Sequence, residues 1–122
     1  MIHNRKLNHS QKLFTSVQWA KLLANYNKNW KRSIKGLKNT DPRPVVKLFN
    51  PYGAQTWLLS ECDEQGTAFG LCDLGLGCAE LGYVSMDEIC NIGYIERDLH
   101  FHPKRKMSEY VQDAEEIGRI VT

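Results

Sequence analysis

Five charged residues in the second half of the chain could carry acid–base chemistry. Carboxylates that lie close together act as general acids and bases or bind Mg²⁺. On a regular strand over residues 95–101, alternation places Glu96 and Asp98 on one face and Arg97 on the other. A solvated strand face or a structural ion pair explains the same residues equally well. The candidate polar cluster comprises Asp73, Glu80, Glu96, Arg97 and Asp98.

Metal ligation has weaker support. His100 and His102 stand two residues apart, so on a strand they share one face and supply half of a metal site. Solvated histidines at a strand end are the simpler interpretation. The four cysteines are spaced 10, 6 and 12 residues apart and lack the close pairs of a zinc site. We therefore expect reduced, mostly buried thiols, with no metal and no cofactor.

Four glycines crowd residues 70–82, where positive φ angles and close backbone approach could cradle a phosphate. The nucleotide-binding fingerprints, however, place the glycine turn between a strand and a helix. Here the flanking residues on both sides predict strands. A tight connection between two strands is the favoured interpretation.

The clearest interaction element is a basic helix face. Apolar residues from Trp19 to Leu37 recur at steps of three and four, which is typical of an amphipathic helix with that row in the core. Thr15 and Gln18 have capping-box spacing at its start. The opposite face could follow a phosphate backbone or an acidic protein surface. The residues of this predicted binding face are Lys21, Lys28, Arg32 and Lys35.

Charge is divided unevenly along the chain. Residues 1–47 contain eleven Lys and Arg and one acid, a net charge of +10, whereas residues 48–122 carry a net charge of −8. Such asymmetry is typical of a segment that contacts nucleic acid or an acidic protein surface. It also fits a basic segment that lies on its own acidic body.

These elements predict one α+β domain over residues 16–122, preceded by a basic N-terminal arm over residues 1–15. Further strands are expected over 45–49, 56–61, 68–73 and 83–85. A short helix should begin after Ser85, and a final helix should span 108–117 before Gly118. We expect a small antiparallel or mixed sheet of about five strands, with helices mainly at the two ends. No run suits a membrane span and the first residues lack a secretion signal, so we expect a cytoplasmic protein.

Several motifs together resemble domain-of-unknown-function family 2958, a family of small bacterial proteins. They are Pro44–Pro51, Thr56–Glu61, Phe69–Gly75 with Glu80–Ser85, and Ile95–Phe101 followed by Ser108-Glu109-Tyr110. The resemblance covers about residues 16–119. The chain departs from the family pattern at Cys78-Ala79, where an aromatic–proline pair is usual, and in its longer, more basic N-terminus.

The resemblance implies an accessory protein of plasmids, integrative elements or phages, often encoded near antirestriction or conjugation functions. It implies no activity and no catalytic residue. We therefore expect a non-enzymatic counter-defence protein, of anti-CRISPR or antirestriction type, that binds and occludes a host defence protein or nucleoprotein complex. The alternatives are a nucleic-acid-binding accessory protein in plasmid or phage maintenance and a small enzyme built on the candidate polar cluster. The sequence leaves the oligomeric state open.

Overall fold

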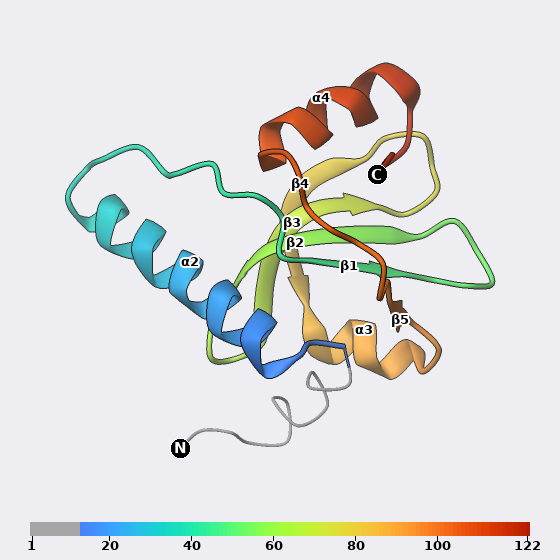
Figure 1. Cartoon of the computed structure of the whole chain (residues 1–122), viewed down its shortest axis with the longest axis horizontal. Coiled ribbons are helices and arrows are strands. Elements are labelled where there is room, and N and C mark those ends of the chain that lie inside the picture. Colours follow the sequence, from blue (N-terminus) through green and yellow to red (C-terminus); the bar gives the residue numbers. More distant parts are fainter. Residues whose placement is uncertain (1–12) are drawn as a thin grey trace.

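The computed structural model describes residues 13–122 of the chain. Helix α2 comes first and is followed by four strands, a short helix, a fifth strand and a last helix (Figure 1). This is the expected α+β arrangement. The elements are α2 (Ser16–Ile34), β1 (Val46–Phe49), β2 (Thr56–Cys62), β3 (Thr67–Asp73), β4 (Glu80–Ser85), α3 (Met86–Ile92), β5 (Glu96–Arg97) and α4 (Met107–Ile117).

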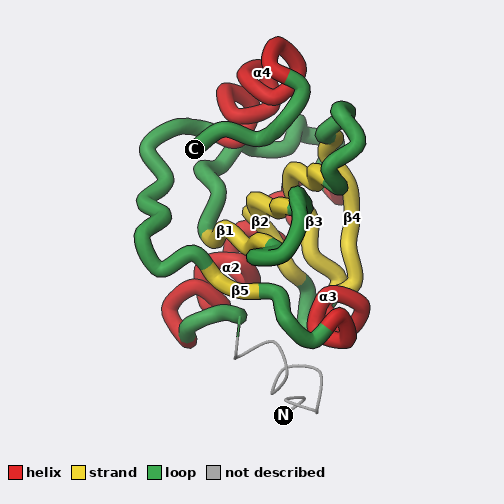
Figure 2. Tube along the Cα trace, turned by 90° about the vertical axis from the view of Figure 1, so that its right-hand side faces the viewer, coloured by secondary structure: helices red, strands yellow, loops and turns green. Residues whose placement is uncertain are grey.

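The strands form one antiparallel sheet in the order β4-β3-β2-β1-β5 (Figure 2). Short connections join β1 to β2, β2 to β3 and β3 to β4, so each neighbour in sequence is also a neighbour in the sheet. The last strand crosses to the far side and pairs with β1. Strand β4 is therefore one edge of the sheet and β5 is the other.

Two apolar clusters cover the two faces of the sheet. Successive residues of a strand point to opposite faces, and β2 shows this directly. Trp57 and Leu59 belong to a cluster with Leu22 of α2 and Ile89 of α3, whereas Leu58 packs with residues of α4. Figure 1 accordingly shows α4 above the sheet and α3 below it.

The predicted helix ends are confirmed. The Thr15 hydroxyl accepts from the Gln18 backbone N–H at 3.0 Å, and the Gln18 side chain accepts from the Thr15 N–H at 2.9 Å, which is the predicted capping box. Ser85 caps α3, and Gly118 ends α4 in the left-handed conformation with a φ of 91°. Leu13 and Phe14, inside the predicted arm, are buried in the core; residues 1–12 lie outside the described part.

The glycine-rich segment is a connection between strands, as expected. Residues 74–79 link β3 to β4, and Gly75 and Gly77 have φ angles of 81° and 83°. Only glycine adopts this backbone conformation without strain. Strand β4 begins at Glu80, three residues before the predicted 83–85 strand.

The predicted strand over residues 95–101 is wrong for most of its length. Strand β5 contains only Glu96 and Arg97. Immediately after them, the Asp98 carboxylate accepts from the His100 backbone N–H at 2.8 Å, which turns the chain away from the sheet. Glu96 and Asp98 therefore do not share a strand face, and neither histidine lies on a strand.

Within residues 13–122, no helix combines the length and the apolar character that a membrane crossing requires.

Candidate functional site

Two asparagines fix how α2 lies against the sheet. The Asn29 side chain is 5% exposed and donates to the Glu61 carboxylate at 2.8 Å. Its carbonyl oxygen accepts from the backbone N–H of Thr40 at 2.7 Å and from the Thr40 hydroxyl at 2.8 Å. One turn earlier, Asn25 donates to the backbone carbonyl of Ser60 at 2.9 Å. The helix is thus bound to β2 and to the chain that follows α2.

These contacts meet β2 at an irregular point. The register between β2 and β3 shifts between Leu59 and Glu61, so Ser60 is the extra residue of a bulge. A bulge leaves a backbone group without a ladder partner, and the Asn25 amide supplies one at Ser60. Burial raises the pKa of the Glu61 carboxyl above its ordinary value, an effect that the Asn29 hydrogen bond partly opposes.

Because α2 turns these polar side chains inward, its apolar row is rotated outward by about a quarter of a turn. The prediction that this whole row lies in the core is wrong. Trp19 packs against the core, but Trp30, Ile34 and Leu37 are 51%, 65% and 50% exposed. Trp30 and Ile34 lie one turn apart at the end of α2, and Leu37 follows three residues beyond the helix end. These three residues are called the exposed apolar row below.

The predicted basic residues lie on the side of the helix opposite this row. Lys21, Lys28 and Lys35 are exposed, and within residues 13–122 none of the three side chains makes a hydrogen bond or an ion pair. Arg32 differs because it is only partly exposed and donates from Nε to the Lys38 carbonyl at 2.6 Å. It therefore closes the end of α2 as well as adding charge. The contact between the basic face and an acidic body of the same chain is not formed by these residues.

A groove of about 760 Å³ runs beside the first half of α2. Its other walls come from residues 42–45 and 97–103, which the fold brings together. Four basic side chains from three separate segments line it, namely Lys21, Arg43, Arg97 and His102. The acid that also lines it, Asp98, lies 3.4 Å from the Lys47 ammonium.

The candidate polar cluster does not form a single site. Asp73 is 3% exposed, and its two carboxylate oxygens accept from the backbone N–H groups of Gly75 and Ile120 at 2.8 and 3.0 Å. It is therefore a structural residue that fastens the C-terminal segment to the β3 end. Asp73 and Asp98 both border a hollow of about 550 Å³. Arg97 lines the groove beside α2, while Glu80 lies on the opposite sheet edge.

Metal ligands do not gather in the described part of the chain. No group of three His, Cys, Asp or Glu side chains within residues 13–122 could hold a metal ion. His100 and His102 are exposed loop residues; His3 and His9 lie outside the described residues. None of the four cysteines forms a disulfide, and burial raises the pKa of the Cys62 thiol to about 12 and that of Cys72 to about 11.

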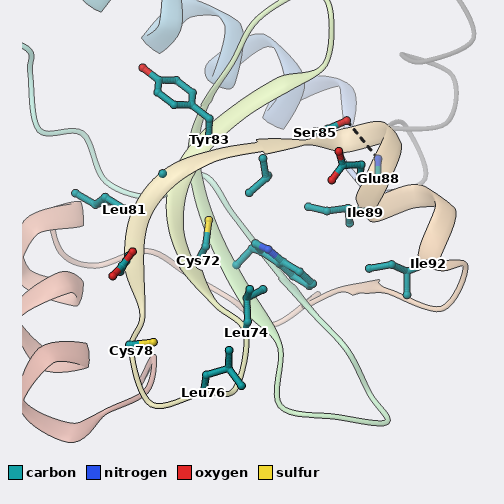
Figure 3. A pocket seen from close by; sticks show the side chains of 14 residues that line it. Cys72, Leu74, Leu76, Cys78, Leu81, Tyr83, Ser85, Glu88, Ile89 and Ile92 are labelled. Carbon is teal, nitrogen blue, oxygen red and sulfur yellow. Dashed lines mark hydrogen bonds between the residues drawn. The ribbon is translucent and has the colours of Figure 1, made fainter.

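A second, more apolar groove of about 600 Å³ lies over β3 and β4 beside α3. Figure 3 shows Cys72 and Ile89 pointing into it, with Leu74 and Leu76 at its rim. Leu81 and Tyr83 point to the other side of β4. Cys78, in the loop after β3, is the exposed cysteine.

Sequence reasoning missed Asn25 and Asn29 as the residues that orient α2. The available signal was their spacing of four, which places two amides on one side of the helix. That side is adjacent to the apolar row, so the two patterns compete for the core. The deciding factor is the bulge at Ser60, which the sequence does not reveal.

The fold and these surfaces define a small α+β protein in which helices cover both faces of an antiparallel sheet, and in which one helix exposes apolar residues near its end and basic residues on its opposite side. The chain matches the model of the family described as "Protein of unknown function (DUF2958)" over residues 13–121, and it belongs to that family. No curated protein and no solved structure matches the chain.

Proposed function

We propose that this protein is a non-enzymatic accessory of a mobile genetic element that acts in the cytoplasm against a host defence system. It covers a surface of a host protein or nucleoprotein complex, of the CRISPR or restriction type. The observation that carries the binding role is the exposed apolar row at the C-terminal end of α2, together with lysines on the opposite side of the helix that are unpaired within residues 13–122. The link to host defence rests on the family resemblance.

The composition of this surface favours a protein partner. Interfaces between proteins combine a buried apolar or aromatic centre with a polar rim, and tryptophan is frequent among the residues that contribute most. Trp30, Ile34 and Leu37 supply such a centre. Lys28 and Lys35, on the other side of the helix, add positive charge that steers an acidic partner toward this end of the molecule. The partner therefore presents an apolar pocket on a surface rich in Asp, Glu or phosphate groups.

A phage-protection assay tests this proposal. Cells that carry a CRISPR or restriction system targeting a phage are challenged with and without the full-length protein. We expect the wild-type protein to raise the plating efficiency of the phage on these cells. We expect the K28E/K35E variant to lose this effect. The matched control is K104E/R119E, which changes the net charge equally at exposed positions outside α2. Failure of the wild-type protein to protect against any defence system of its host contradicts the proposal.

Direct nucleic-acid binding, in element maintenance or transfer, is the second candidate. The half-exposed Trp30 ring favours it, because an aromatic side chain on a lysine-rich helix can stack on an unpaired base. Single-stranded DNA binding in a mobility-shift assay, with affinity falling steeply as salt rises, supports this candidate. Trp30→Ala and K28E/K35E should both weaken such binding, whereas K104E/R119E should leave it unchanged.

The small-enzyme alternative has the least support. It requires the candidate polar cluster to converge, and Asp73 is held by two backbone N–H groups while Glu80 lies on the far sheet edge. Neither arrangement leaves a pair of free carboxylates facing a common cavity.

A further inference from the structure

Strand β4 exposes an unpaired backbone edge. It pairs with β3 on one side, from Glu80 opposite Cys72 to Ser85 opposite Thr67. Across residues 13–122, the backbone groups of residues 80–84 make no hydrogen bond to any other segment. Figure 2 shows β4 as the outermost strand on its side of the sheet. Half of its N–H and C=O groups therefore point away from the protein.

This edge lacks the features that usually prevent strand pairing. Natural edge strands are shortened, bulged, or carry lysine or proline. The other edge, β5, has two residues, and both of them are charged. Strand β4 has six residues in an unbroken register and contains neither lysine nor proline. On one face it presents Leu81 and Tyr83, which are 45% and 75% exposed.

We infer that β4 pairs antiparallel with β4 of a second copy of this chain, about a two-fold axis at Gly82. In that register Leu81 of each copy lies opposite Tyr83 of the other, on the face where Tyr83 already contacts Phe69 with ring centroids 5.0 Å apart. Aromatic–aliphatic pairs across strands stabilise a sheet. The two five-stranded sheets become one continuous sheet, and one patch serves both copies.

The choice of Gly82 as the centre follows from side-chain chemistry. Directly opposed residues of an antiparallel pair point to the same face of the sheet. The two-fold axis must therefore pass between the two copies of one residue. With the axis at Gly82, all five residues from 80 to 84 are paired with the second copy. The Glu80 carboxylates of the two copies are then separated by about 13 Å along the strands. An axis at Leu81 brings these carboxylates to diagonal positions, and an axis at Tyr83 places each Leu81 opposite Ser85. A Cβ atom added at Gly82 would meet nothing within 4 Å, so the sheet face is open at the axis.

This surface is separate from the one in the proposed function. Helix α2 contacts β2, and β3 lies between β2 and β4. Self-association through β4 therefore leaves the exposed apolar row of α2 free, and the complex presents two copies of that row. Loss of pairing and loss of partner binding can be measured independently.

Analytical ultracentrifugation of the full-length chain, from low to high micromolar concentration, tests the inference. We expect the wild-type protein to approach twice its 14.0 kDa chain mass as concentration rises. L81K/Y83K places lysines opposite lysines twice and should raise the dissociation constant by about tenfold or more. The control Y52K/L99K adds the same charge at residues 83% and 71% exposed and should associate like the wild type. A wild-type protein that stays monomeric throughout overturns the inference, as does a dimeric L81K/Y83K variant.

A mixing experiment tests the register and does not depend on the double variant folding. Only the axis at Gly82 places position 81 of one copy directly opposite position 83 of the other. An L81K chain and a Y83E chain therefore bring opposite charges together in the mixed dimer, which neither variant does by itself. We expect the mixture of L81K with Y83E to associate more tightly than either variant alone. Equal or weaker association of the mixture overturns the Gly82 register.

Discussion

Helices α4 and α2 both pack on the sheet, yet they do so by different means. Helix α4 buries the first three residues of its apolar row: Met107, Tyr110 and Ala114 are at most 4% exposed and pack with Leu58 and Leu71, whereas Ile117 at the helix end is 54% exposed. Helix α2 buries Leu22 together with Asn29, and leaves Trp30 and Ile34 largely in solvent.

The difference shows when hydrophobic periodicity decides the orientation of a helix. Leu58 and Leu71 of the sheet pack against α4, so burial of apolar area decides which face of the helix turns inward. Opposite α2, the bulge at Ser60 and the Glu61 carboxylate need hydrogen-bond donors. An unsatisfied buried polar group costs about 1–3 kcal/mol. Meeting these two requirements stabilises the observed orientation of α2 more than the burial of Trp30 and Ile34 would stabilise the alternative one.

The largest effect is expected at α4, where apolar packing decides which helix face turns inward. Tyr110→Ala should lower the free energy of unfolding by about 3–5 kcal/mol, because it removes a buried ring from the α4 contact. Chemical denaturation followed by circular dichroism measures the change. Tyr110→Phe is the control and should cost much less, because it keeps the ring. A loss below about 1 kcal/mol for Tyr110→Ala contradicts the assignment of α4 to the core.

Removal of a polar contact of α2 should have an intermediate effect. Asn29→Ala leaves the Thr40 N–H and the Glu61 carboxylate without their partner and should cost about 1–3 kcal/mol. Asn27→Ala, at an exposed position of the same helix, corrects for the change in helix propensity. If the two variants are equally stable by denaturation, the polar contact does not orient α2.

Much of this fold could be predicted from local sequence signals. The capping residues Thr15 and Ser85, the Gly118 helix end and four strand positions follow from rules that act within a few residues. The length of β5 could not be predicted. It depends on Asp98, which forms an ion pair with Lys47 of another strand and accepts a hydrogen bond from the His100 backbone N–H in the turn that follows. The scattering of the candidate polar cluster and the position of the exposed apolar row likewise depend on which strands become neighbours. Local residue spacing does not predict that pairing.

A pH dependence is expected of the α2 contact, because it includes the partly buried Glu61 carboxyl. Burial raises the folded-state pKa of Glu61 above its ordinary value of 4.5. The folded state therefore holds the proton more tightly than the unfolded state, so stability falls as pH rises from 4.5 through the folded-state pKa. Glu61→Gln should flatten this segment of the stability curve, by less than about 1 kcal/mol because the group is still partly solvated. Glu64→Gln, an exposed neighbour, should leave the curve unchanged.

The smallest effect on stability is expected at the exposed apolar row, and it is the most informative about function. Ile34→Ser removes an aliphatic group that is 65% exposed, so the free energy of unfolding should change by no more than about 0.5 kcal/mol. The equivalent change at Leu22, which is fully buried, should be severe. A large loss of stability for Ile34→Ser means that this row packs within the protein, and the proposed binding surface would then be wrong. An unchanged stability together with lost phage protection instead assigns the row to partner contact, because a residue that does not stabilise the fold can affect protection only through what it touches outside the chain.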